Sequence, residues 1–243
     1  MKQFGLIGYP LSHSFSKKYF ADKFENEHIS NCQYDNYPLK EINEFSDLVA
    51  NTSLVGLNVT IPYKQAVIPF LNDLDAEAEA IGAVNTIQIR NKKLKGFNTD
   101  VYGFVESLMP FILERNHLKA LILGTGGASK AVAFGLKKLH IPYEYVSRQK
   151  TDNGTTYDAL TIDQIKEHHL IINTTPLGMF PNVDDAPSIP YDGIGDEHIL
   201  YDLVYNPEET LFLVKGKERG AQTKNGLEML HLQAEKAWEI WNK

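Results

Sequence analysis

The chain has a single cysteine, Cys32, among 243 residues, and this scarcity narrows the kinds of protein it can be. One cysteine excludes an internal disulfide and a cysteine-rich metal site, so we expect no metal and predict that Cys32 is a small buried apolar side chain. No apolar stretch approaches membrane-spanning length, and the first one, residues 4–8, is too short for a signal-peptide core. A cytoplasmic location is the expectation that follows.

Positive charge is also in short supply. The chain has 24 lysines and arginines against 31 aspartates and glutamates, which gives a formal net charge of -7. This balance disfavours a nucleic-acid-binding surface, although it leaves room for a local basic site that binds a phosphorylated cofactor. Hydrophobic residues make up 43% and charged residues 23%, as in ordinary globular proteins. A chain of this length forms one large domain or two small ones.

The glycine-rich segment 124–129 is the most informative stretch that is present. An apolar run, Ala120–Leu123, leads into Gly-Thr-Gly-Gly-Ala-Ser, and a helical pattern follows at once. This predicts a strand, a tight turn and a helix N-terminus, whose free N–H groups bind a pyrophosphate. Gly124 permits the turn, and Gly126 lets the backbone approach the phosphates. A turn of this kind in a protein that binds no nucleotide is the competing interpretation.

The next predicted strand, residues 143–146, carries information about the type of dinucleotide. NAD-binding proteins tend to have an acidic residue after this strand, which accepts a hydrogen bond from the ribose 2′-hydroxyl. This chain has Ser147-Arg148-Gln149-Lys150 there, without an acid. A pair of cations suits a 2′-phosphate, so the sequence favours NADP. Two exposed basic residues without a ligand are the alternative.

Polar residues follow several other predicted strands of this α/β pattern, where ligands of open sheets bind. Asn58, Thr60 and Lys64 follow the strand 54–59, a hydroxyl-rich loop follows the first strand, and Asp100 opens a helix. Each has a simpler explanation: the serines cap a helix, Lys64 is a solvated charge, and Asp100 is a cap or first-turn acid.

The rest of the pattern predicts the following arrangement. A domain change falls at residues 100–118, and the last helix carries two packing tryptophans. The expected elements are helices at 39–50, 75–81 and 208–219, strands at 82–87, 170–173, 199–204 and 221–223, and a loose connection at 153–158.

Taken together, these segments resemble the shikimate dehydrogenase (shikimate/quinate dehydrogenase) family over nearly the whole chain. The matching stretches are Ser14–Ser16, Asn58–Lys64, Gly82–Thr86, Asn98–Asp100, Gly124–Ser129, Asn173–Met179 and Met229–Ala234. The resemblance implies an α/β fold with two domains: an N-terminal substrate-binding domain and a Rossmann-like dinucleotide-binding domain. The C-terminal helix is expected to pack back on the first domain. The boundaries expected are 1–100 with 225–243, and 101–224.

The resemblance also implies reversible NADPH-dependent reduction of 3-dehydroshikimate to shikimate, in the biosynthesis of chorismate and the aromatic amino acids. The implied catalytic pair is Lys64 and Asp100. The implied substrate-binding residues are Ser14 and Ser16 for the carboxylate, Thr60, Asn85 and Gln233 for the ring hydroxyls, and Tyr205 at the pocket. The expected NADP-binding residues are Gly124, Gly126, Gly127, Ala128, Ser129, Ser147, Arg148, Lys150, Thr174, Thr175 and Met179.

The chain departs from the family pattern in a few places. Lys17 and Lys18 replace a proline and the polar residue after it, Ser147-Arg148-Gln149 replaces Asn-Arg-Thr, and Asn225 stands where glycine or aspartate is common. The second of these departures keeps open a broader quinate/shikimate dehydrogenase that uses NAD or NADP. The methylene-tetrahydrofolate dehydrogenase group and a non-catalytic dinucleotide-binding regulator are further alternatives. We expect a small-molecule substrate, a monomer or homodimer, and no nucleic-acid or membrane partner.

Overall fold

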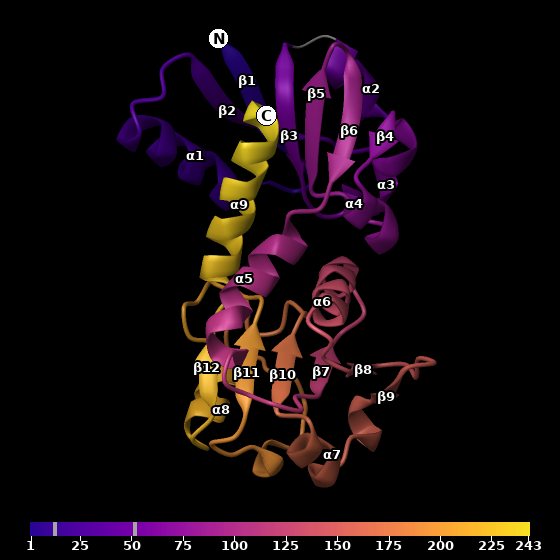
Figure 1. Cartoon of the computed structure of the whole chain (residues 1–243), viewed down its shortest axis with the longest axis vertical. Helices are drawn as coiled ribbons and strands as arrows, with labels where there is room; N and C mark the ends of the chain where they lie inside the picture. Colours follow the sequence, from indigo (N-terminus) through magenta and orange to yellow (C-terminus); the bar gives the residue numbers. More distant parts are fainter. Residues whose placement is uncertain (12–13, 51–52) are drawn as a thin grey trace. The chain divides into compact units, whose positions relative to one another are not determined.

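The chain folds into two compact units. The computed structural model describes residues 1–11, 14–50 and 53–243, and it divides into Met1–Thr99 with Ala234–Lys243, and Asp100–Gln233 (Figure 1). The chain passes from the first unit to the second where helix α5 (Asp100–Ile112) begins. It passes back within helix α9 (Leu227–Asn242).

The first unit is built on a mixed sheet with the strand order β2-β1-β3-β5-β6-β4. Strands β1, β2 and β3 are parallel, and β5 runs antiparallel to its neighbours β3 and β6. The strands are β1 (Lys2–Gly8), β2 (Cys32–Pro38), β3 (Leu54–Val59), β4 (Asp73–Leu74), β5 (Thr86–Arg90) and β6 (Lys93–Phe97). The helices are α1 (Phe15–Asn26), α2 (Glu44–Ala50), α3 (Tyr63–Ala66), η1 (Ile68–Phe70) and α4 (Ala76–Ile81).

The C-terminal part of α9 packs on this sheet, as the resemblance implies. Trp241 is 4% exposed, stacks on Phe4 and donates from its indole nitrogen to the carbonyl oxygen of Ile87 at 3.0 Å. Gly56 lies directly against the Trp241 ring, where any side chain would collide with it. Trp238 packs on Phe24. The prediction that both tryptophans are packing residues is therefore confirmed.

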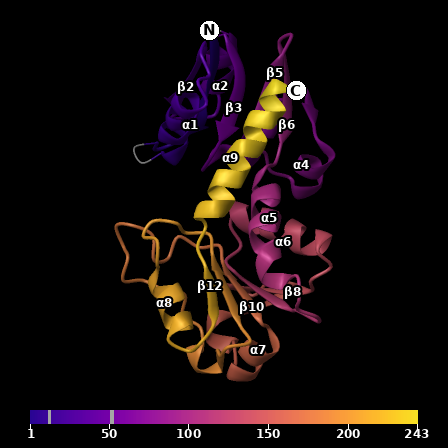
Figure 2. The same cartoon turned by 60° about the vertical axis from the view of Figure 1, so that its left-hand side comes forward.

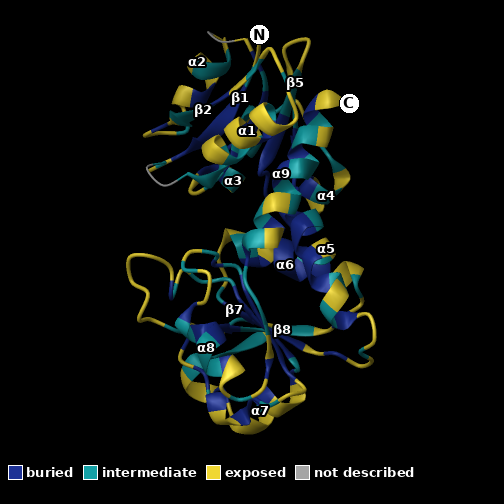
Figure 3. Ribbon diagram, turned by 90° about the vertical axis from the view of Figure 1, so that its left-hand side faces the viewer, coloured by how far each residue is buried: buried dark blue, intermediate teal, exposed yellow. Residues whose placement is uncertain are grey.

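The second unit holds an all-parallel sheet with the order β12-β11-β10-β7-β8-β9. Counted along the unit this is the 3-2-1-4-5-6 order of dinucleotide-binding domains. Every residue of β7, β10 and β11 is buried, with apolar side chains on both faces of the sheet, and Figure 3 shows β7 in dark blue. Helix α8 lies beside β12 in Figure 2. The strands are β7 (Ala120–Leu123), β8 (Tyr143–Ser147), β9 (Gly154–Thr156), β10 (Leu170–Asn173), β11 (Ile199–Asp202) and β12 (Gln222–Lys224). The other helices are α6 (Gly127–Lys138), η2 (Tyr157–Ala159), α7 (Ile162–Glu167), η3 (Tyr191–Gly193) and α8 (Leu211–Lys217).

The segment 153–158 is not the loose connection that its polarity predicts, because it contains strand β9. Tyr145 donates its backbone N–H to the carbonyl oxygen of Asn153 at 3.0 Å, and Gly154 lies so close to the Tyr145 carbonyl that a side chain would not fit. A three-residue polar edge strand has no apolar alternation by which the sequence would show it. Only residues 148–153 join β8 to β9, so no crossover helix lies between these parallel strands.

Other element boundaries shift by a few residues. The helix expected at 39–50 begins only at Glu44, and the strand expected at 82–87 begins at Thr86. The helix expected at 208–219 covers Leu211–Lys217, with the Thr210 hydroxyl accepting from the Leu213 backbone as its N-cap. None of the described helices has the length and apolarity that a membrane crossing requires.

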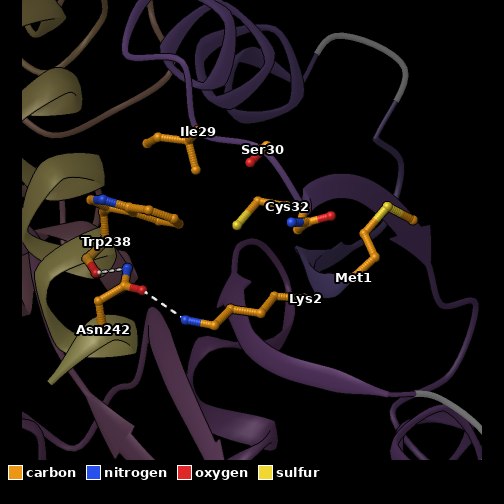
Figure 4. Close-up of a pocket in the computed structure, with 8 residues that line it drawn as sticks. Met1, Lys2, Ile29, Ser30, Cys32, Trp238 and Asn242 are labelled. Carbon is orange, nitrogen blue, oxygen red and sulfur yellow. Dashed lines mark hydrogen bonds between the residues drawn. The ribbon is translucent and has the colours of Figure 1, made fainter.

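Cys32 is less buried than predicted. It is half-buried and lines a hollow of about 470 Å³ with Ile29 and the Trp238 ring, across which Lys2 donates to Asn242 at 3.3 Å (Figure 4). Burial raises the pKa of the Cys32 thiol, so the reactive thiolate is disfavoured at neutral pH.

Candidate active site

The expected substrate residues of the first unit gather at one edge of its sheet. Strands β1, β3 and β6 end at this edge, and β5 begins there because it runs antiparallel. Backbone hydrogen bonds join the segments that leave the strands: Thr60 N donates to Ile7 O at 2.9 Å, and Val59 N donates to Asn85 O at 2.8 Å. The fold thus brings polar segments from distant parts of the sequence to the same edge.

Ser14 stands at the start of α1 but does not cap it. It occupies the N-cap position without a side-chain cap hydrogen bond, and its Oγ is buried with no hydrogen-bond partner among the described residues. An unsatisfied buried hydroxyl carries a desolvation cost that a ligand would remove. Ser16 hydrogen-bonds the Tyr34 hydroxyl. The other serine of the hydroxyl-rich loop, Ser12, and its neighbour His13 lie outside the described residues.

Asn85 is tied to the turn that leads into α5. Its Oδ1 accepts from the Thr99 backbone N–H at 2.7 Å, and its Nδ2 donates to Thr99 Oγ1 at 3.0 Å. Nearby, Asn58 Oδ1 accepts from the Tyr34 hydroxyl at 2.8 Å, and Asn58 Nδ2 donates to Thr86 Oγ1 at 3.3 Å. Asn85 therefore fixes the backbone directly before Asp100, and its contact with substrate stays a prediction.

The two expected catalytic residues are both held by short, well-defined elements. Lys64 is the second residue of α3, and its carbonyl oxygen accepts from Val84 N at 2.7 Å, which anchors α3 to the segment before β5. Asp100 is the first residue of α5 and is 5% exposed. Lys64 belongs to the first unit and Asp100 to the second, and their pairing stays a prediction.

The glycine-rich turn has the features that a pyrophosphate needs. Gly124 has φ +98°, and a Cβ there would lie 2.8 Å from the Thr175 methyl group, so only glycine fits. At Gly126 and Gly127 a Cβ would meet no atom within 4 Å, so the N-terminus of the twelve-residue helix α6 is open. Ser129 is buried and donates to Gly126 O at 2.7 Å, which tightens the first turn. These residues fit an anionic dinucleotide bound through backbone N–H groups.

The loop after β8 presents two cations to solvent. Arg148 and Lys150 are exposed, and neither forms an ion pair within the described part of the chain. Ser147 is buried, and its hydroxyl donates to the carbonyl of Gln149, which sets the course of the loop. Burial raises the pKa of the nearby Tyr157 hydroxyl, and the Arg148 charge opposes this. Two exposed cations that form no ion pair among the described residues suit a 2′-phosphate, and this contact stays a prediction.

The loop after β10 carries three of the expected cofactor residues. Thr174 donates from its hydroxyl to the carbonyl of Leu123 at 2.7 Å, which joins this loop to the end of β7. Thr175 bonds to Asn173, while Met179 and Phe180 are 47% and 57% exposed at the loop tip. Two exposed apolar side chains in this loop suit contact with a flat ring of the cofactor.

The last two expected substrate residues lie near the edge of β11 and on α9. Tyr205 is half-buried, and burial raises the pKa of its phenol, which therefore remains a hydrogen-bond donor at neutral pH. Gln233 lies where α9 crosses α5, and a Cβ at Gly103 would touch its backbone at 3.2 Å. The close approach made possible by Gly103 places Gln233 beside the first turns of α5.

Two polar residues of the second unit, Asn173 and Asp202, were missing from the predicted site. Each is the last residue of an otherwise apolar strand, and both are fully buried. Asn173 Nδ2 donates to Asp202 Oδ1 at 2.9 Å. A polar residue that ends a buried strand at the carboxyl edge of a parallel sheet is the signal by which the sequence could have shown them.

The buried carboxyl of Asp202 makes stability depend on pH. Burial raises its pKa to about 6, against about 4 in an unfolded chain, although hydrogen bonds from Thr210, Val204 and Asn173 oppose the rise. The native state therefore binds a proton more tightly than the unfolded state, and Asp202 should add stability as pH falls from about 7 to 4. The gain is at most about 3 kcal/mol, because each tenfold difference in proton affinity between the two states corresponds to about 1.4 kcal/mol.

This prediction is checked by urea unfolding of the wild type and Asp202→Asn at several pH values. The free energy of unfolding of the wild type should rise relative to that of the variant as the pH is lowered. A difference between the two proteins that stays constant from pH 7 to 4.5 would show that the pKa of Asp202 is not raised.

The fold, together with the polar residues at the carboxyl edges of the two sheets, defines a class of protein. It is a two-unit α/β protein with a Rossmann-type dinucleotide-binding unit. Residues 6–87 match the shikimate dehydrogenase substrate binding domain. The chain is 40% identical, over all of its length and 93% of the relative, to the shikimate dehydrogenase (NADP(+)) of Clostridium beijerinckii. The same name belongs to a Methanococcus maripaludis protein that is 37% identical over 99% of this chain and 91% of that one. The chain belongs to the shikimate dehydrogenase family.

Solved structures share this fold over nearly the whole chain. Shikimate 5-dehydrogenase from Thermus thermophilus, in complex with NADP(H) and shikimate, superposes with a TM-score of 0.86 at 30% identity, covering 99% of this chain and 93% of that one. A 5-ketofructose reductase from Gluconobacter has a TM-score of 0.83 at 28% identity, covering 98% of this chain and 92% of that one. The predicted fold and family are thus confirmed.

Proposed function

We propose that this chain is an NADP-dependent shikimate dehydrogenase, which reversibly reduces 3-dehydroshikimate to shikimate with NADPH in chorismate biosynthesis. The observation that carries the proposal is the polar edge of the first sheet, with the buried, unpartnered Ser14 hydroxyl in its serine loop. A substrate carboxylate would accept a hydrogen bond from that hydroxyl. The full-length likeness to shikimate dehydrogenases supports the same reaction.

Reduction of a ring ketone needs a proton at oxygen and a hydride at carbon. Lys64 donates the proton or stabilises the developing alkoxide. Asp100 is proposed as its partner, because a carboxylate near the ammonium group favours the charged lysine and fixes its direction. Bound nicotinamide supplies the hydride.

The substrate is recognised by hydroxyl and amide groups. Ser14 and Ser16 are proposed to hold the carboxylate. Ring hydroxyls are proposed to bond to Thr60, Asn85, Gln233 and Tyr205. The raised pKa of the Tyr205 phenol supports its role as a donor. This set of neutral donors and acceptors suits a polyhydroxylated acid.

The cofactor is proposed to lie along the carboxyl edge of the second sheet. Its pyrophosphate binds the N–H groups at the open start of α6, residues 126–129. Arg148 and Lys150 hold the 2′-phosphate, with Ser147 shaping their loop. Thr174, Thr175 and Met179 are proposed to contact the nicotinamide end. The protein is proposed to act in the cytoplasm, as a monomer or homodimer.

The decisive experiment follows nicotinamide absorbance with purified protein, in a grid of shikimate or quinate against NADP or NAD. We expect strong activity only with shikimate and NADP. Activity spread over the grid would favour a broader quinate/shikimate dehydrogenase. Folded protein that binds NADP but is silent in every combination would contradict the proposed reaction and favour a non-catalytic dinucleotide-binding regulator.

Replacing Ser14 with alanine should raise KM for shikimate by about 10- to 100-fold, which corresponds to one hydrogen bond to a charged group. The thermal midpoint of the ligand-free protein should stay the same or rise, because the hydroxyl bonds to no described residue and its burial is costly. A capping serine would instead lose about 1 kcal/mol of stability. The control is Ser53→Ala. The Ser53 hydroxyl donates to the half-buried Gln3 side chain, and Ser53 precedes β3, at the other end of that strand. An unchanged KM with a lowered midpoint would show that Ser14 is structural.

A further inference from the structure

Asp202 is a buried acid that the proposed chemistry does not use. It is 0% exposed at the end of β11 and forms no ion pair among the described residues. Its Oδ1 accepts from the backbone of Val204 at 3.0 Å, and its Oδ2 accepts from the Thr210 hydroxyl at 2.6 Å. A buried carboxylate without a cation is costly for stability. These hydrogen bonds offset part of that cost, and they also tie the end of β11 to the residues that follow it.

Asn173 extends this network to the neighbouring loop. One of its amide hydrogens goes to Asp202 Oδ1, and Nδ2 also lies 3.4 Å from the carbonyl of Leu177. Its Oδ1 accepts from the backbone N–H of Thr175 at 3.0 Å and from the Thr175 hydroxyl at 2.7 Å. The orientation of the Asn173 amide is fixed on both sides, and the course of residues 174–177 is fixed with it.

Further contacts join the loop after β10 to the loop after β11. Phe180 N donates to the carbonyl of Asn206 at 3.1 Å. Gly178 has φ +86°, and a Cβ there would lie 3.3 Å from Thr210, the residue that bonds to Asp202. Asp202 thus occupies the centre of a network that includes both loops.

We propose that Asp202 is a positioning residue that, through Asn173 and Thr210, holds loops 174–180 and 203–210 in a single arrangement and thereby sets the affinity for the dinucleotide. The part that concerns affinity rests on the proposed function, in which Thr174, Thr175 and Met179 bind NADP. The part that concerns the loops does not. Asp202 touches no reacting atom in this proposal.

Three variants separate positioning from general stability. Asp202→Ala removes all three acceptor contacts. Asp202→Asn keeps an acceptor oxygen for Val204 and Asn173, and its new amide donates to the Thr210 hydroxyl, so the geometry survives without the charge. The control is Ser107→Ala, which removes the buried 2.6 Å hydrogen bond to the Tyr201 hydroxyl on the same strand, away from both loops.

The first readout is hydrogen–deuterium exchange of the ligand-free full chain. With Asp202→Ala, backbone exchange in 174–180 and 203–210 should rise by about tenfold or more, while exchange in β7 and β8 stays as in the wild type. Asp202→Asn should remain within about threefold of the wild type in both loops, and Ser107→Ala should leave them unchanged. Unchanged loops in Asp202→Ala, or equal changes in Ser107→Ala, would overturn the proposal.

The second readout is the dissociation constant for NADPH, from the quenching of protein fluorescence, followed by a comparison of Michaelis constants. Asp202→Ala should weaken NADPH binding by about tenfold or more, while KM for shikimate changes by less than about threefold. Wild type that binds no NADPH would overturn the proposed function, and the exchange data would still decide the role of Asp202. If Asp202→Ala does not fold, Thr210→Val, which removes one of the three contacts, takes its place in both measurements.

Discussion

Replacement of Lys64 with alanine is expected to lower kcat for shikimate oxidation by about 10²- to 10⁴-fold, the usual contribution of a positioned general acid or base. The loss follows from the chemistry: without the Lys64 amine, the substrate hydroxyl has no positioned acceptor for its proton as the hydride leaves. In the reverse reaction, the developing alkoxide has no cationic partner and no proton donor. The affinity for NADPH should stay within about twofold, because Lys64 lies on α3 of the first unit, and the open helix start lies on α6 of the second. Stopped-flow absorbance and NADPH fluorescence titration measure the two quantities.

Two further variants make this test specific. Lys64→Met keeps most of the side-chain volume without the charge, and it should be as inactive as the alanine variant. Lys18→Ala removes an exposed lysine of α1 that forms an ion pair with Asp22, one turn further along α1. This variant should have the wild-type kcat. A Lys64 variant with near-normal turnover would remove this residue from the mechanism. Equal losses in Lys18→Ala would show that net charge, rather than position, is responsible.

The parts of the fold that follow from hydrophobic runs and special backbone positions were predictable from the sequence. Ala120–Leu123 and the helix after Gly124–Ser129 lie where the pattern places them, because four apolar residues buried on both faces leave little alternative. Strand β9 was missed, because its three polar residues owe their pairing to β8 and not to their own pattern. Local sequence carries little information about an edge strand of this kind.

The candidate site also contains residues that the sequence could predict and residues that it could not. The resemblance could nominate Ser14, but only the structure shows that its hydroxyl is buried and does not cap α1. Capping is the default function of a serine before a helix, so local reasoning favours it. Asp202 and Asn173 were not predicted, because their importance lies in their hydrogen bond to each other and in hydrogen bonds to the two loops that follow them. Such networks depend on tertiary arrangement, which no short motif encodes.

The variant Arg148→Leu is expected to raise KM for NADP by about 10- to 100-fold and to change KM for NAD by less than about threefold. The reason is that no acidic side chain competes with the phosphate for the guanidinium group: Arg148 is exposed and forms no ion pair among the described residues. It also follows the buried Ser147, which fixes the loop. A guanidinium group in this state keeps its full capacity for a charge-assisted contact with phosphate, worth about 1.5–3 kcal/mol. The ratio of kcat/KM for the two cofactors, measured at one ionic strength, gives the effect directly.

The control for Arg148 is Lys166→Gln, which removes one positive charge from α7 in the same unit, before β10 begins and so at the opposite edge of the sheet. Its ratio of kcat/KM for NADP to kcat/KM for NAD should equal that of the wild type. If both variants raise KM for NADP equally, the net charge of the unit attracts the cofactor, and no single residue selects it. If Arg148→Leu raises KM for NADP and for NAD alike, the side chain contacts the adenosine rather than the 2′-phosphate.

The variant Lys150→Gln separates the contributions of the two cations. It should change the ratio of kcat/KM for NADP and NAD less than Arg148→Leu does, because an ammonium group contacts phosphate as a point charge and not through a planar fork.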